Sequence, residues 1–223
     1  MELENIINFE NVYVNYDIDS STLRNINLKI KNNENWAILG ANGSGKSTLI
    51  KLFSNDLYPT TKYPFKKEIF GEENWNIFEL KKNLGIITND LHNTFGSQGK
   101  YITAYEVILS GFYSSIQIFN HQDFTKEQHQ KVLEVLEFLE ILELKDKKVH
   151  QMSTGQLRRC IIGRALIHDP KAFILDEPTV GLDIKSQHSF IKLIQKLSKS
   201  ASIIIVTHQI GRASCRERVL IRV

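Results

Sequence analysis

Residues 40–48 read Gly40-Ala-Asn-Gly-Ser-Gly-Lys-Ser-Thr48 and fit the phosphate-binding pattern G-x-x-x-x-G-K-[ST] in full. The apolar run Trp36–Leu39 predicts a buried strand before this loop, and Leu49–Phe53 predicts a helix after it. Glycines at 40, 43 and 45 let backbone N–H groups approach a phosphate closely, and the helix start adds its positive dipole end. The stretch therefore predicts a strand–loop–helix site for a nucleoside triphosphate or another phosphate ligand.

Each polar residue of this loop has an expected role. The Lys46 ammonium is expected to reach the β- and γ-phosphates, and the Ser47 hydroxyl is expected to bind Mg²⁺. The other residues expected to contact the nucleotide are Gly40, Asn42, Gly43, Ser44, Gly45 and Thr48.

Composition predicts one globular domain with room for a subdomain. The chain has 223 residues, of which 42% are hydrophobic and 24% are charged. No apolar run approaches the ~20 residues needed to cross a bilayer, and the N-terminus lacks the basic start of a signal peptide. We therefore expect a cytoplasmic protein. Its two cysteines, Cys160 and Cys215, do not suggest a disulfide framework.

Residues 210–223 differ in composition from the body of the chain. Residues 210–219 read as the translation of a common short-read sequencing adapter, ATC GGA AGA GCG TCG TGT AGG GAA AGA GTG. This tail also carries the whole formal net charge of +3, so the remainder is neutral and offers no basic face for nucleic acid. We expect 210–223 to be non-native and the native domain to be cut short near Gln209. The alternatives are a genuine Arg-rich helix or a basic arm.

Hydrophobic periodicity gives an order of strands and helices. Strands are predicted at 9–16, 23–30, 85–88, 172–175 and 203–206. Residues 103–145 are predicted to be helical, with capping boxes that begin at Thr103 and Thr125, and further helices are predicted at 156–167 and 184–197. Residues 55–83 are expected to mix loop and short strand. Strands alternating with helices predict an α/β fold with a largely parallel sheet and an inserted helical block.

Two acids end the strand Phe173–Glu177. Ligands of parallel sheets bind at the carboxyl ends of the strands, so Asp176 is expected to hold Mg²⁺ and Glu177 to activate water as a general base. The acids could instead cap the next helix, but their pairing with a phosphate loop favours catalysis. His208 follows the last buried strand and could bind a γ-phosphate or the attacking water.

Residues 152–156 read Met152-Ser-Thr-Gly-Gln156 and precede a predicted helix. Ser153 is a candidate N-cap, and a helix N-terminus is an anion site, although every capped helix offers one. Together with the phosphate loop and the Asp-Glu strand, this segment resembles the signature L-S-G-G-Q of the ATP-binding-cassette (ABC) ATPases. The resemblance runs from about Phe9 to His208.

The resemblance implies a P-loop NTPase fold with an N-terminal antiparallel β subdomain and a helical subdomain at about 90–168, within an ABC ATPase domain at 1–209. It implies that Tyr16 stacks on adenine and that Ser153, Gly155 and Gln156 contact the nucleotide of a partner subunit. His208 matches the switch histidine, and residues 181–183 match a dimer-contact loop. Asn89 falls where the family has a glutamine that binds Mg²⁺ and links it to the helical subdomain. Because Asn89 is one methylene shorter, Asp90 is the alternative ligand.

The implied function is Mg²⁺-dependent ATP hydrolysis by a dimeric subunit that powers a separate membrane permease from the inner face of the membrane. Residues 84–92 and 153–159 look most like the molybdate-transport and photorepair branch. The alternatives are a non-transport cassette protein working on ribosomes or DNA, as part of a tandem-cassette chain, and a P-loop kinase. The signature argues against the kinase, and no nucleic-acid partner is expected.

Overall fold

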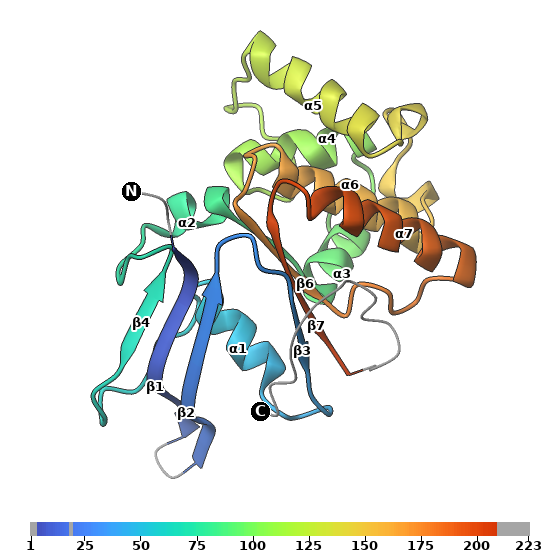
Figure 1. The fold of residues 1–223 in the computed structure, drawn as a ribbon. Helices are drawn as coiled ribbons and strands as arrows, with labels where there is room; N and C mark the ends of the chain where they lie inside the picture. Colours follow the sequence, from blue (N-terminus) through green and yellow to red (C-terminus); the bar gives the residue numbers. More distant parts are fainter. Residues whose placement is uncertain (1–3, 18–19, 209–223) are drawn as a thin grey trace.

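The structure, a computed structural model, describes residues 4–17 and 20–208; Figure 1 shows two sheets with a helix between them and further helices beyond. Strand β1 (Asn5–Asp17) pairs antiparallel with β2 (Ser20–Lys31) on one side and with β4 (Lys66–Ile69) on the other. The second sheet is parallel, in the order β3 (Trp36–Leu39), β7 (Ser202–Thr207), β6 (Ala172–Asp176) and β5 (Leu84–Ile87). The expected α/β class, with one antiparallel and one parallel sheet, is confirmed.

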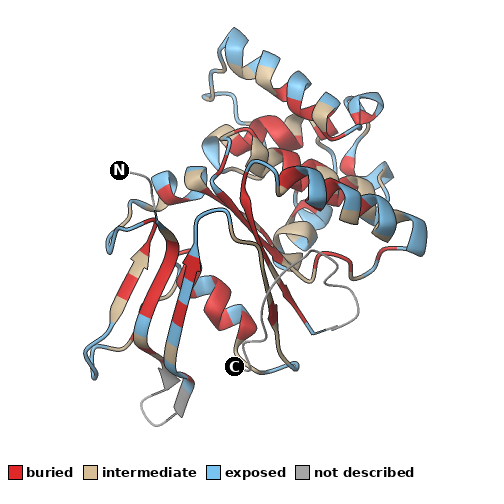
Figure 2. Cartoon of the chain, viewed as in Figure 1, coloured by how far each residue is buried: buried red, intermediate tan, exposed pale blue. Residues whose placement is uncertain are grey.

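The parallel sheet is buried on both faces because its strands are almost wholly apolar. In β6, Ala172 and Ile174 face helix α1 (Lys46–Phe53) and the antiparallel sheet, whereas Phe173 and Leu175 face the other helices. Side chains alternate between faces along a strand, so one strand joins two cores. Figure 2 shows β5, β6 and β7 mostly buried, β3 mostly half-buried, and the outer helix faces exposed. This arrangement places the carboxyl ends of β3 and β6 on either side of the carboxyl end of β7.

Most of the other helices cover the face opposite α1 (Figure 1). They are α3 (Asn89–Ser97), α4 (Ala104–Leu109), α5 (Lys126–Phe138), α6 (Thr154–Leu166) and α7 (Ile184–Leu197), with short 3₁₀ turns at Ser110–Tyr113, Leu142–Leu144 and Val149–Gln151. Gly163 lets α6 approach α4 closely, since a Cβ there would lie 2.8 Å from the Ile108 and Leu139 side chains. Among the described residues, none of the helices combines the length and apolar character that crossing a bilayer requires.

Three local features differ from the sequence-based expectation. Helix α2 (Ile77–Asn83) lies in the stretch expected to hold only loop and strand, capped by the Asn76 side chain, which accepts from the Phe78 N–H at 2.9 Å. Helix α3 was also not anticipated; its N-cap is Thr88, whose hydroxyl accepts from the Leu91 N–H at 3.2 Å.

The expectation of helix throughout 103–145 is wrong. Ser114 adopts a left-handed φ of 52° that ends the first helical run, and the chain is irregular until Thr125 caps α5. Both capping boxes, at Thr103 and Thr125, are present as predicted. The anomalous tail 210–223 lies outside the described residues.

Candidate nucleotide-binding site

The phosphate loop joins β3 to α1 in a conformation that requires glycine. Gly43 and Gly45 have φ angles of 79° and 92°, and Gly45 occupies the N-cap position of α1. The Lys46 ammonium is buried under the loop, where it donates to the carbonyls of Gly40 at 2.7 Å and Ala41 at 2.8 Å. The three glycines of the loop and the Lys46 side chain, which folds back onto the loop, thus form an electropositive cradle at a helix N-terminus.

A pocket of about 330 Å³ opens over this cradle. It is lined by Thr22, Asn42, Gly43, Gly45, Lys46, Ser47, Thr48, Asp176 and Glu177. The structure therefore brings most of the predicted loop residues together with both predicted acids. Gly40 and Ser44 are not among the lining residues and lie close together within the loop, where a Cβ on Gly40 would lie 2.4 Å from the Ser44 Oγ.

Two features of the pocket fit a magnesium–nucleotide complex. The Ser44 hydroxyl oxygen is buried without a hydrogen-bond partner among the described residues, which leaves it available to a phosphate oxygen. Burial and, second, the neighbouring Glu177 raise the pKa of Asp176 to about 6. A carboxylate held in this way is stabilised by a cation, and a serine hydroxyl with an aspartate is a donor set that suits Mg²⁺. Ser47 and Asp176 are thus the residues that would hold the metal.

Glu177 is held at both its backbone and its carboxylate. It is a non-glycine residue at a φ of 46°, and its N–H donates to the Val206 carbonyl at 2.8 Å. Its Oε2 accepts from the Thr207 hydroxyl at 2.8 Å. Its Oε1 accepts from the His208 N–H at 2.8 Å and lies 2.6 Å from His208 Nδ1. The structure therefore joins the two residues, Glu177 and His208, that the sequence predicted separately.

Asn89 and Asp90 open α3 immediately beyond β5 and have different surroundings. The Asn89 Oδ1 accepts a hydrogen bond from Arg158 Nη2 at 2.9 Å. Asp90 instead lines a groove together with Ser47 and Asp176, and its charge contributes to the raised pKa of Asp176. Of the two candidate metal ligands, Asp90 is therefore the one that shares a cavity with Ser47 and Asp176.

Arg158 is a residue that the sequence-based reasoning missed. It lies on α6, is only 4% exposed, and shares a helix face with the buried Ile161 and Ile162. An arginine within an apolar stripe needs buried acceptors, and that pattern was the available signal.

The signature segment lies away from the phosphate loop of the same chain. Ser153 caps α6: its hydroxyl accepts from the Gln156 N–H at 3.3 Å, and Gln156 Oε1 accepts from the Ser153 N–H at 3.0 Å. Ser153, Gly155 and Gln156 line a separate pocket of about 360 Å³ that shares no lining residue with the nucleotide pocket. One chain therefore does not unite the two predicted nucleotide-contacting segments.

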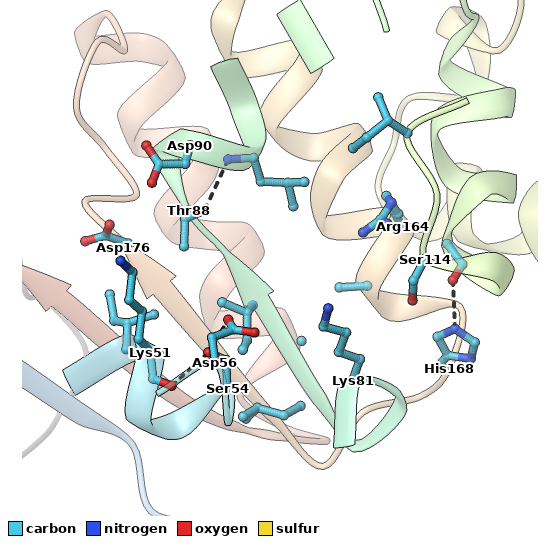
Figure 3. A pocket seen from close by; sticks show the side chains of 18 of the residues that line it. Lys51, Ser54, Asp56, Lys81, Thr88, Asp90, Ser114, Arg164, His168 and Asp176 are labelled. Atoms are coloured by element: carbon cyan, nitrogen blue, oxygen red, sulfur yellow. Dashed lines mark hydrogen bonds between the residues drawn. The ribbon is translucent and has the colours of Figure 1, made fainter. Parts of the chain in front are cut away.

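A third cavity, of about 340 Å³, lies between α1, β5 and α6 (Figure 3). Asp90 and Asp176 lie together on one side of this groove, and Lys81 and His168 lie on the other. Its lining also includes the apolar side chains of Ile50, Leu84, Ile86, Leu91 and Ile116. The groove thus borders the nucleotide pocket through the shared residues Ser47 and Asp176.

Of two further expected features, one is only partly described. Tyr16 belongs to β1, but its side chain lies outside the described part of the structure. The loop expected to contact a partner is present, with Gly181 at a φ of 76° and Asp183 capping α7 through a 2.9 Å hydrogen bond from the Ser186 N–H.

Residues 23–180 match the family described as ABC transporter. The chain is 33% identical over 208 residues to the energy-coupling factor transporter ATP-binding protein EcfA3 of Clostridium perfringens, covering 92% of this chain and 70% of that protein. It is similar in structure to cbiO1 from Clostridium perfringens, part of the ABC transporter complex cbiONQ, with a TM-score of 0.77, 31% identity, and coverage of 94% of this chain and 81% of that one.

A second similar solved structure contains the products of hydrolysis. It is a dimeric ATP-binding cassette in a post-hydrolysis state bound to ADP and Pi, with a TM-score of 0.71, 28% identity, and coverage of 93% of this chain and 90% of that one. The family match spans the phosphate loop, the acid pair and residues 152–156. The chain therefore belongs to the ABC transporter family and is one of its ATP-binding ATPases.

Proposed function

We propose that this chain hydrolyses ATP as one half of a dimer and that the dimer drives a separate membrane permease from the cytoplasmic side. The dimer is inferred from the separation of the two segments that are predicted to contact nucleotide. The phosphate loop and acids line one pocket, and Ser153, Gly155 and Gln156 line another. A second cassette can complete the site by presenting its signature to the first.

The chemistry follows from the residues of the nucleotide pocket. Lys46 exchanges its two carbonyl partners for the β- and γ-phosphates, and the backbone N–H groups of the loop bind the phosphate oxygens. Bound Mg²⁺ supplies positive charge to the phosphates. Glu177 accepts a proton from the water that attacks the γ-phosphorus, the bond to the β–γ bridging oxygen breaks, and ADP and phosphate are released.

The shared site can be tested by mixing two inactive variants. Lys46→Ala disables the phosphate loop, and Ser153→Arg disables the signature; each variant alone gives a dimer with no intact site. In a mixed dimer, the phosphate loop of the Ser153→Arg chain meets the intact signature of the Lys46→Ala chain. Random mixing then predicts about a quarter of the wild-type rate. A mixture that forms dimers and stays inactive would contradict the shared site.

The groove of Figure 3 is the surface that we assign to the permease. Its lining combines apolar side chains such as Ile50 and Ile116 with charged ones such as Lys81 and Asp90, which suits a short amphipathic segment. The groove also borders the nucleotide pocket at Ser47 and Asp176. A partner seated there lies next to the residues that would hold Mg²⁺, so binding and hydrolysis can influence one another.

This assignment predicts that Lys81→Glu or Ile116→Glu abolishes co-purification with the partner permease. The matched control is Lys82→Glu, because Lys82 is the neighbouring exposed lysine and pairs with Glu79 at 2.7 Å outside the groove. Co-purification that survives both groove variants would remove the groove from the proposal. Salt-dependent binding of nucleic acid by residues 1–209, with no permease bound, would favour the non-transport alternative.

A further inference from the structure

We propose that Arg158 is a positioning residue for ATP hydrolysis, one that holds the backbone of Glu177 in its productive conformation and ties it to the start of α3 at Asn89. The inference rests on the role proposed above for Glu177. It adds a buried side chain that touches neither the phosphate loop nor the signature pocket.

The guanidinium of Arg158 joins two segments that are far apart in the sequence. Its Nη1 donates to the carbonyl of Glu177 at 3.0 Å and also to the carbonyl of Pro178. Its Nη2 donates to Asn89 Oδ1 at 2.9 Å. The planar, fixed fork of arginine serves both segments at once, which a lysine ammonium on a flexible stem cannot do as precisely.

Glu177 needs such support because its backbone lies in the left-handed region, with a φ of 46°. Residues other than glycine, asparagine and aspartate rarely adopt this backbone conformation. It persists only where the surrounding structure enforces it. Val206 fixes the N–H of Glu177 and Arg158 fixes its carbonyl. The Glu177 carbonyl also accepts from the Val180 N–H at 3.2 Å. Without the guanidinium, this carbonyl keeps only that longer hydrogen bond, and the carboxylate of the same residue can move.

The same guanidinium orients the beginning of α3. With the Asn89 oxygen turned to Arg158, the next residue, Asp90, faces the groove beside Asp176. Burial lowers the pKa of Arg158, whereas the nearby Asp176 raises it. Arginine still stays protonated at neutral pH, so the link does not depend on a titration in the physiological range.

The test compares Arg158→Met and Arg158→Lys with the control Lys131→Met. Lys131 is a cationic residue of α5 that pairs with Asp169 at 2.7 Å and lines neither the nucleotide pocket nor the signature pocket. We expect Arg158→Met to lower kcat by about 10- to 100-fold and Arg158→Lys by less, because a misplaced catalytic group costs rate. The affinity for a fluorescent ATP analogue should change by no more than about twofold, because Arg158 does not line the pocket. The rates are expressed per competent nucleotide site, which removes any loss due to unfolded protein.

To distinguish a positioning role from a purely structural one, Arg158→Met is repeated in a Glu177→Gln background. If Arg158 acts through Glu177, Arg158→Met should leave the residual rate of that background within about twofold, because residues acting as a unit are not additive. Asn89→Ala, which removes the acceptor without emptying a buried position, should show part of the same loss.

The inference is overturned if Arg158→Lys and Asn89→Ala both match the Lys131→Met control while Glu177→Gln is inactive. It is also overturned if Arg158→Met causes its full loss again in the Glu177→Gln background. Should Glu177→Gln itself hydrolyse ATP like the wild type, the proposed role of Glu177 fails, and the inference falls with it.

Discussion

His208 Nδ1 lies 2.6 Å from Glu177 Oε1, and the backbone N–H of His208 donates to the same oxygen at 2.8 Å. The other carboxylate oxygen accepts from the Thr207 hydroxyl at 2.8 Å. Both oxygens of the proposed base are therefore bonded to the end of β7, the strand that lies between the phosphate-loop strand and the acid strand. This contact connects the proposed base to His208, the residue predicted to bind the γ-phosphate or the attacking water.

The first prediction concerns Glu177→Gln. The amide keeps the size of the side chain but cannot accept the proton from water, so hydrolysis should fall by about 10²–10⁴-fold. Binding of ATP should persist because Lys46 and the loop N–H groups are unchanged. Phosphate release and equilibrium binding of a fluorescent ATP analogue measure the two effects. Glu79→Gln is the control, since Glu79 is exposed and pairs with Lys82 on α2; equal rates in the two variants would exclude Glu177 as the base.

The second prediction concerns the coupling between His208 and Glu177. His208→Ala removes the imidazole contact and leaves the backbone hydrogen bond, so kcat should fall while the affinity for nucleotide changes little. Combined with Glu177→Gln, it should add almost nothing, because the histidine acts on a base that is already absent. Additive losses in this double-mutant cycle would indicate that His208 works independently of Glu177.

The third prediction concerns the acid Asp176 and pH. Burial, followed by the charge of Glu177, raises its pKa from 3.8 to about 6 in the nucleotide-free protein. The folded state therefore binds a proton more tightly than the unfolded state, so this group's contribution to stability is lost as pH rises from about 4 to about 6. Asp176→Asn should abolish that loss and stabilise the nucleotide-free protein at pH 7 by on the order of 1 kcal/mol, after discounting for solvent screening.

Thermal unfolding between pH 4 and pH 7 measures this difference in the absence of nucleotide. The same substitution should remove Mg²⁺-dependent hydrolysis, and the wild type should need more Mg²⁺ below pH 6, because only the ionised carboxylate binds the cation. Parallel stability curves for wild type and Asp176→Asn would contradict the assigned origin of the pKa shift.

The predictability of this fold from its sequence varied with how local the signal was. The strand Trp36–Leu39 and the helix Ile184–Leu197 were predicted to the residue, because an apolar run before a glycine loop and an apolar stripe after Asp183 are complete local signals. Helix α3 was missed because its sequence, Asn89–Ser97, has few apolar residues and depends on the Thr88 cap and on packing of Phe95. The break after Ser114 was missed because tertiary contacts decide it, with Gly111 packed against the Arg164 carbonyl of α6.

The residues of the candidate site also divide into those that a local motif predicts and those that depend on tertiary contacts. Lys46, Ser47, Asp176 and Glu177 lie on motifs at strand ends, and topology brings strand ends together, so their proximity could be predicted. Arg158 could not be assigned in this way, since its partners at Asn89 and Glu177 lie 69 and 19 residues away in the chain. The contact between His208 and Glu177 likewise depends on the pairing of β6 with β7, which a single sequence does not encode locally.

The last prediction concerns Lys67, a lysine buried at 5% exposure in the antiparallel sheet. Its ammonium bonds to Asn55 Oδ1 and lies 5.3 Å from the centre of the Tyr58 ring, and burial lowers its pKa from 10.5 to about 8. The unfolded chain therefore holds this proton up to about pH 10.5 while the folded chain releases it near pH 8. The unfolded state binds more protons between these values, so the free energy of unfolding should rise with pH across that interval.

Lys67→Met lacks this proton and should lack the rise, which amounts to about 2 kcal/mol after allowance for partial solvent screening. Lys66→Met is the matched control. Lys66 is exposed, pairs with Glu68 at 2.9 Å, and has its pKa raised by that hydrogen bond. Urea unfolding at pH 7, 8.5 and 10 should show the rise in the wild type and in Lys66→Met. If Lys67→Met keeps the rise, another group is responsible, and Lys67 is charged in the folded protein up to its ordinary pKa.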